Sequence, residues 1–168
     1  GTNDGLNRYD GYEFNMYRYN ADGGRGLNSN LIQTLAEDKN NNIWIGTSDG
    51  GVNVIQSLNQ EILNISVLEK QSSLLEKESI YGIDIIDSIA IVLTKERIFF
   101  FKVIENGVHH IKVNNKVFIE TGSTITNCYH RVSKNEFIIG TKHGLKFLRL
   151  NNEKELEVNI TDHEKKIN

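Results

Sequence analysis

Short apolar runs, separated by turns rich in Asn and Gly, follow one another along most of the chain. Asp49-Gly50 lies between two of these runs, one ending at Gly46 and the other beginning at Val52. An Asp-Gly pair between apolar segments is a strong signal for a β-hairpin, because glycine tolerates the positive φ that a tight turn requires. The pattern therefore predicts many short antiparallel strands.

A turn that begins with threonine recurs along the chain. Thr2 begins Thr-Asn-Asp-Gly, Thr47 begins Thr-Ser-Asp-Gly and Thr141 begins Thr-Lys-His-Gly, while Thr94 begins a weaker copy, Thr-Lys-Glu-Arg. These threonines are 45, 47 and 47 residues apart, and a run of strand-forming residues follows each turn. Nearly equal spacing of this kind indicates an internal repeat.

Each complete repeat contains four predicted strands. They cover residues 31–36, 43–46, 52–55 and 61–68 in the first unit, 80–86, 89–93, 98–104 and 109–113 in the second, and 124–132, 136–140, 145–150 and 156–160 in the third. Residues 6–9 and 12–19 supply only the last two strands of an earlier unit. Residues 68–78 have a helix-like composition and predict a loop with a local helical turn.

Four short antiparallel strands at a period of about 40–50 residues are typical of a β-propeller blade. The predicted fold class is all-β, an incomplete propeller ring of about three and a half blades. Residues 1–20 are the C-terminal half of a blade, residues 21–68, 69–113 and 114–160 are one blade each, and residues 161–168 are a polar tail. Such an arc leaves an apolar blade face open at both ends.

Composition narrows the function classes. Proline is absent, where average usage would give about eight, so the 21 asparagines and 14 glycines must make the turns. The net charge of −3 predicts no electrostatic attraction to nucleic acid or to an anionic membrane. No apolar run reaches the roughly 20 residues of a membrane helix, so no direct membrane contact is expected in this segment. The single Cys128 excludes an internal disulfide.

Two stretches resemble the two-component regulator propeller repeat: residues 1–11 with Phe14 and Tyr17, and residues 27–52, which include Ile-Trp-Ile-Gly-Thr. The unit around Thr94 departs from this pattern, because Leu93 replaces a glycine. The resemblance implies a non-catalytic part of the periplasmic sensor region of an inner-membrane hybrid two-component protein. Any histidine kinase activity would then lie in other parts of that protein.

The same resemblance implies the partners and the mechanism. The expected partners are the remaining propeller blades of the parent protein, a second copy in a homodimer, and an oligosaccharide ligand. Sensing of glycan fragments would be transmitted by propeller and dimer packing. Two alternatives stay open: an interaction scaffold that only dimerises, and a carbohydrate-active propeller enzyme, which would need paired carboxylates facing one cleft.

Candidate binding residues lie in the crossing loop before the first complete unit. Arg25 and Asn28 could bind carboxylate or hydroxyl groups there, because such crossings lie on a propeller face. No catalytic residue, metal ligand or cofactor is expected. Asp4, Asp10 and Asp49 fit Asx-turns better than a calcium loop.

Three further side-chain types are assigned to packing. Trp44 has a ring suited to stacking on a sugar, but Ile91 and Ile138 occupy its place in the other repeats, which predicts a core position between blades. The alternating aromatic row from Tyr9 to Tyr19 predicts cross-strand packing, with part of it uncovered. Cys128 is expected to be a buried thiol.

Overall fold

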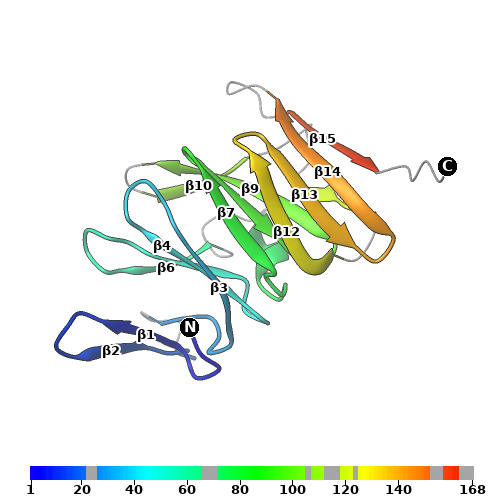
Figure 1. Cartoon of the computed structure of the whole chain (residues 1–168). Coiled ribbons are helices and arrows are strands. Elements are labelled where there is room, and N and C mark those ends of the chain that lie inside the picture. Colours follow the sequence, from blue (N-terminus) through cyan, green and yellow to red (C-terminus); the bar gives the residue numbers. More distant parts are fainter. Residues whose placement is uncertain are drawn as a thin grey trace.

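The computed structural model describes residues 1–21, 26–65, 72–104, 107–111, 118–122, 125–151 and 157–162. Over these residues, the strands form four antiparallel sheets that follow one another in chain order (Figure 1). The sheets stand side by side from the N-terminal hairpin, at the bottom of Figure 1, to the sheet that holds the last strands. The predicted all-β fold class is confirmed.

Each sheet is an up-and-down antiparallel meander, to which sheet 2 adds one further strand. The N-terminal hairpin contains β1 (Leu6–Tyr9) and β2 (Phe14–Tyr17). Sheet 1 contains β3 (Ile32–Glu37), β4 (Ile43–Thr47), β5 (Val52–Ile55) and β6 (Ile62–Asn64). Sheet 2 contains β7 (Gly82–Ile86), β8 (Ile89–Leu93), β9 (Arg97–Ile104), β10 (Gly107–Ile111) and β11 (Phe118–Glu120). Sheet 3 contains β12 (Ile125–Ser133), β13 (Glu136–Thr141), β14 (Gly144–Asn151) and β15 (Glu157–Asp162).

The predicted strands appear in the predicted order, most of them with small shifts at their ends. The exception is β6, which covers residues 62–64 of the predicted 61–68, and residues 66–68 lie outside the described residues. The expected helical turn between the first two units is the short 3-10 helix η1 (Ser72–Leu75). Strand β5, which follows the Asp49-Gly50 turn, has the predicted bounds because both of its ends are set by turn residues.

Strand β11 is the main difference from the sequence-based division. The division assigns residues 114–160 to the third blade, yet β11 pairs with β9 of sheet 2, with Phe118 opposite Phe99 and Glu120 opposite Arg97. Strand β9 is eight residues long, so its free edge accommodates β10 and then β11 one after the other. Sheet 2 therefore extends to Glu120 rather than to residue 113.

The C-terminal boundary differs for a similar reason. Thr161 and Asp162, placed by the sequence in a polar tail, end strand β15 and pair with Phe147 and Lys146 of β14. Because β14 is also eight residues long, it offers pairing positions beyond Ile160.

The core lies between the sheets rather than inside any one of them. Each complete sheet has a leading face, which points toward the next sheet along the chain, and a trailing face, which points toward the preceding one. Trp44 on the leading face of sheet 1 packs against Phe101 on the trailing face of sheet 2, with their ring centroids 6.2 Å apart. Phe100 on the leading face of sheet 2 belongs to one cluster with Phe137 of sheet 3. Strands buried on both faces in this way require apolar runs rather than alternation.

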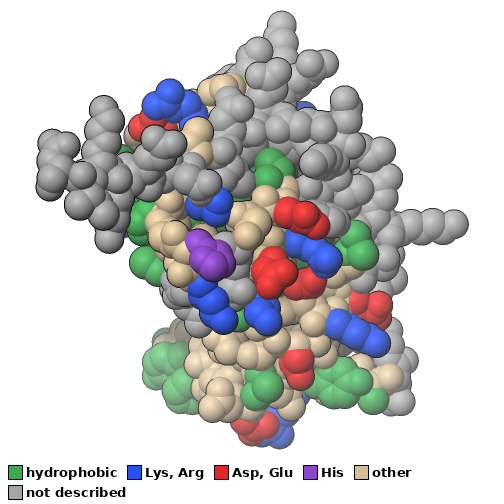
Figure 2. Space-filling model, turned by 90° about the vertical axis from the view of Figure 1, so that its right-hand side faces the viewer, with side chains coloured by type: hydrophobic (Ala, Val, Ile, Leu, Met, Phe, Trp, Pro, Cys, Tyr) green, Lys and Arg blue, Asp and Glu red, His purple; other side chains and the backbone are tan. Residues whose placement is uncertain are grey.

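No described residue covers the apolar faces at the two ends of the row. On the hairpin, the trailing face carries Tyr9, Phe14 and Met16, which are 59%, 69% and 55% exposed. On sheet 3, Val132 of the leading face is 54% exposed. Figure 2 shows hydrophobic side chains toward the bottom, at the level of the hairpin, and charges of both signs interspersed over the middle of this face. The predicted cross-strand packing is confirmed for Tyr9 and Phe14, whose ring centroids are 4.8 Å apart.

Candidate functional site

The two sequence-predicted binding residues have different outcomes. Arg25 lies outside the described residues. Asn28 is partly buried, and its side-chain amide donates to the carbonyl of Gly50 at 2.9 Å, while its backbone N–H donates to Oδ1 of Asn53 at 3.0 Å. Gly50 fits against it only because it lacks a side chain, since a Cβ there would lie 2.8 Å from the backbone of Asn28. Asn28 therefore holds the β4–β5 turn, and its role toward a ligand stays a prediction.

The repeated threonines hold the turns, a role that the sequence did not reveal. The hydroxyl of Thr47 donates to the carbonyl of Gly51 at 2.9 Å and accepts from the N–H of Gly50 at 3.0 Å. Thr2 and Thr141 make the same pair of contacts across their own turns. One hydroxyl thus satisfies a donor and an acceptor of the tight turn at these three positions. In the weaker copy, the hydroxyl of Thr94 donates to the carbonyl of Arg97 at 3.4 Å.

The Asx-turn prediction is confirmed for Asp10, whose Oδ1 accepts from the N–H groups of Tyr12 and Glu13. It is wrong for the other two aspartates. Asp4 pairs with the guanidinium of Arg18 at 2.5 Å, and Asp49 accepts from the hydroxyl of Ser29 at 2.5 Å. The threonine hydroxyls satisfy those two turns, so the carboxylates bind side chains from neighbouring segments.

Trp44 is fully buried, which confirms its predicted place in the core between blades. Cys128 corrects the sequence interpretation, because its side chain is exposed and not buried. Its neighbour Tyr129 points toward sheet 2, so alternation along β12 turns Cys128 to the leading face of sheet 3. Among the described residues, no further sheet covers that face.

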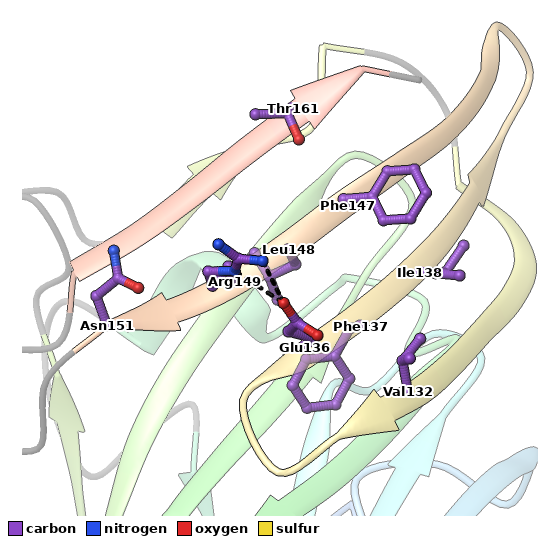
Figure 3. Close-up of a pocket in the computed structure, with 9 residues that line it drawn as sticks. All are labelled: Val132, Glu136, Phe137, Ile138, Phe147, Leu148, Arg149, Asn151 and Thr161. Atoms are coloured by element: carbon purple, nitrogen blue, oxygen red, sulfur yellow. Dashed lines mark hydrogen bonds and ion pairs between the residues drawn. The ribbon is translucent and has the colours of Figure 1, made fainter. Parts of the chain in front are cut away.

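A surface groove of about 650 Å³ lies on the leading face of sheet 3 (Figure 3). Apolar side chains of Val132, Ile138 and Phe147 line it, and Figure 3 shows Glu136 and Arg149 joined beside them. The Nε of Arg149 donates to Glu136 at 2.9 Å. The groove therefore has an apolar floor, and the charges of Glu136 and Arg149 beside it neutralise each other.

The repeat explains what this groove is. Trp44 and Ile91 stand three residues before their threonines, as Ile138 does, and both are at most 1% exposed under the next sheet. Phe100 corresponds in the same way to Phe147 and is fully buried. The positions that line the groove are therefore the ones that a following sheet covers in the rest of the molecule. The groove therefore has the composition of a surface that packs against another blade rather than that of a small-molecule site.

A polar contact joins the first strands of sheets 2 and 3. The Arg131 guanidinium lies 3.2 Å from the carboxylate of Asp84, and the hydroxyl of Tyr129 donates to the carbonyl of Ile83 at 3.1 Å. Burial raises the pKa of Asp84, and the charge of Arg131 opposes this shift. Burial, and to a lesser extent the charge of Asp84, raises the pKa of the Tyr129 phenol. Gly82 fits here against the Tyr129 ring, which would lie 2.3 Å from a Cβ at that position.

The second cavity, of about 350 Å³, lies between the N-terminal hairpin and sheet 1. More of its lining residues have polar side chains than those of the groove do. Its lining residues are Leu6, Asn7, Arg8, Tyr17, Asn41, Ile43, Ile55, Ser57 and Gln60. Within the described segments, no group of three or more His, Cys, Asp or Glu side chains could hold a metal ion, and no helix is long and apolar enough to cross a membrane.

Comparisons with known proteins agree with this architecture. Residues 26–49 match the family model of the two component regulator propeller. No curated protein matches the sequence. Two solved structures from B. thetaiotaomicron share the fold, both described as extracellular domains of hybrid two component systems. The BT3049 domain has a TM-score of 0.64 and 18% identity over 95% of this chain. The BT4673 domain has a TM-score of 0.64 and 17% identity over 97% of it.

This chain spans about a fifth of the length of both solved structures, since the matches cover 20% of each. The predicted incomplete propeller is confirmed, because the sheets of this chain superpose on a part of larger propeller-containing domains. The resemblance to the two-component regulator propeller repeat is likewise confirmed, with the family match located at residues 26–49.

Proposed function

We propose that the chain contributes blades to the periplasmic sensor region of a hybrid two-component signalling protein. The observation that carries this proposal is the family match at residues 26–49 inside a row of sheets that has the fold of such extracellular domains. The sensor would detect glycan fragments and transmit binding through the packing of propellers and of a dimer. Its partners would be the remaining blades of the parent protein, a second copy and an oligosaccharide.

A non-catalytic role agrees with the placement of carboxylates. Glycoside hydrolysis requires two carboxyl groups that face one cleft. Among the described side chains, Glu136 is the carboxylate that lines the groove on sheet 3, where it is paired with Arg149, and none of the described residues that line the cavity beside the hairpin carries a carboxylate. This supports a sensor over a carbohydrate-active enzyme, with catalysis in other parts of the parent protein.

The uncovered apolar faces favour a second candidate, an interaction scaffold. Phe14 and Val132, on opposite ends of the row, are more than half exposed and would be buried by association with further blades or copies. In that case the segment would dimerise and another domain would bind the ligand.

Calorimetry with a panel of neutral and acidic oligosaccharides, together with sedimentation of the 168-residue chain, separates these functions. Saturable heat with one saccharide supports the sensor. Absence of heat across the panel, with a clear dimer in sedimentation, supports the scaffold. Hydrolysis of any saccharide would overturn both proposals.

A further inference from the structure

In the cavity between the hairpin and sheet 1, a charged residue stands at a repeat position that is apolar in the other units. Arg8 is six residues after Thr2, as Phe100 is six residues after Thr94. Val54 of sheet 1 has the same place seven residues after Thr47, because that turn contains one extra glycine, Gly51. Val54 and Phe100 are at most 1% exposed, because the next sheet packs onto them. The corresponding position opposite β1 changes too, since Arg8 pairs with Asn15 where Val54 pairs with Leu63. A departure from the core pattern at one blade interface is the kind of local exception that marks functional sites.

The floor of the cavity is apolar and its rim is polar. Leu6 and Ile55 form the buried floor, at 7% and 5% exposure. On the rim, Nη1 of Arg8 donates to Oε1 of Gln60 at 2.6 Å, and Nε2 of Gln60 donates to the carbonyl of Ser57 at 2.9 Å. An apolar surface with a few fixed polar groups is typical of small-molecule sites, and 350 Å³ lies within their usual range of volumes.

Two residues of the rim hold an unusual backbone conformation. Asn41 has a φ of 60° and Gln60 a φ of 57°, in a region that side chains other than glycine rarely adopt. Among the described non-glycine residues, only Asp87 shares this property. Asn41 projects from the β3–β4 turn and Gln60 from the β5–β6 turn, so both turns of sheet 1 at this end present a residue with positive φ to the same cavity. Asparagine adopts this region readily, whereas for glutamine it is a strained conformation of the kind that clusters at functional sites.

Arg8 sets the charge of the cavity. Within the described residues, it makes no salt bridge, and its hydrogen bond goes to the neutral amide of Gln60. The nearby Asp10 has its pKa lowered chiefly by the N–H groups of Glu13 and Tyr12 and to a smaller extent by Arg8. A guanidinium has five N–H donors, so most of the donors of Arg8 are left for an anionic group. Tyr17 and Ser57 add hydroxyl groups to the lining.

We propose that this cavity is the binding site for a carboxylate-bearing sugar unit, an inference that rests on the proposed glycan-sensing function. The carboxylate binds the guanidinium of Arg8, and the carbon face of the ring lies on Leu6 and Ile55. The sugar hydroxyls bind the amide of Gln60 and donate to Oδ1 of Asn41, whose Nδ2 donates to Glu37 at 2.7 Å. The ligand would bridge the hairpin and sheet 1, so binding would stabilise the packing of one blade on the next.

Amide-resolved NMR titration of the 168-residue chain with D-glucuronate, and with uncharged D-glucose as a comparison, tests the site. Glucuronate should shift the signals of Arg8, Ser57 and Gln60 saturably, and glucose should bind more weakly. Arg8→Gln should weaken glucuronate binding by about tenfold or more, because it removes a charge-assisted hydrogen bond. Gln60→Ala should also weaken it while leaving the charge in place.

Arg18→Gln is the matched control, because Arg18 is also an exposed arginine of the N-terminal segment. Its guanidinium pairs with Asp4 outside the cavity. Melting curves of each variant establish that it is folded. Glucuronate binding that Arg8→Gln leaves unchanged, or that Arg18→Gln weakens equally, overturns the site. Binding of another saccharide with shifts elsewhere in the chain also overturns the site but preserves the sensor function. Failure of the whole saccharide panel to bind overturns both.

Discussion

The indole N–H of Trp44 donates a hydrogen bond of 2.9 Å to Oδ2 of Asp38, and both side chains are buried at the interface between sheets 1 and 2. The same carboxylate accepts from the backbone N–H groups of Asn40 and Asn42 and from the side-chain amide of Asn42. Asp38 therefore shapes the β3–β4 turn and fixes the largest side chain of the core at the same time.

Replacing Asp38 tests this double role. Asp38→Ala should destabilise the chain by about 2–4 kcal/mol, because it leaves the Trp44 N–H buried without a partner and removes the acceptor of the turn. Asp38→Asn keeps one acceptor oxygen and should cost clearly less. The midpoint of urea unfolding, followed by the fluorescence of Trp44, measures both variants. Equal midpoints for wild type and Asp38→Ala would contradict this account.

Gly82→Ala should separate sheets 2 and 3. The added Cβ would lie 2.3 Å from the Tyr129 ring, and neither the β-strand backbone nor the packed ring can yield freely. Overpacking of this kind costs about 1–3 kcal/mol. The double variant Gly82→Ala with Tyr129→Leu should recover part of the loss, as measured by thermal unfolding. If the double variant is less stable than the sum of the single ones predicts, the contact is not the cause.

The threonine turns predict a contrast between two small substitutions. Thr47→Val keeps the branched shape but removes the buried hydroxyl that binds Gly51 and Gly50, and should cost about 1–3 kcal/mol. Thr47→Ser keeps the hydroxyl and should cost less, since only a methyl group is lost. Chemical denaturation of the two variants decides between the hydroxyl and the methyl as the important group. A greater loss for serine than for valine would favour the methyl.

Asp84 makes a prediction about pH. Burial raises its pKa from the usual 3.8, so in the interval above pH 3.8 the folded chain binds more protons at this site than the unfolded chain does. The contribution of Asp84 to stability is therefore fully present at low pH and decreases as the pH rises through the raised pKa. Asp84→Asn should remove this decrease, so the variant should gain stability relative to wild type between pH 3 and pH 7.

Unfolding free energies at those two pH values measure the effect. Arg131→Gln is a useful second variant, because it keeps Asp84 but removes the positive charge that opposes the rise of its pKa. In this variant, the loss of stability with rising pH should be larger than in wild type. If Asp84→Asn instead loses stability relative to wild type as the pH rises, attraction to Arg131 outweighs the cost of burial.

The sequence determined the repeat and nearly all the strands. Threonine spacing, apolar runs and Asn/Gly turn residues are visible in short stretches of the sequence. The strands and turns that they predict form through hydrogen bonds between residues close in the chain. Trp44 could be assigned to the core because the other repeats place isoleucine there, and no knowledge of neighbours was needed. The sequence pattern did not single out Arg8, because only the structure shows the cavity that its side chain lines.

Other features depended on which sheet lies against which. Cys128 is exposed and Tyr129 beside it is half-buried, because alternation along β12 sends one to an uncovered face and the other to sheet 2. Strand β11 joins sheet 2 because β9 has unpaired backbone groups for it, a fact that the composition of residues 118–120 does not contain.

The amino-acid sequence by itself thus determined the blade as a unit, since strands and turns arise from interactions close in the chain. Only the tertiary structure decided which faces are covered and how Arg8 meets Gln60, 52 residues away. The physical reason is that burial and side-chain pairing between sheets depend on contacts between distant segments, which a pattern along one chain does not specify.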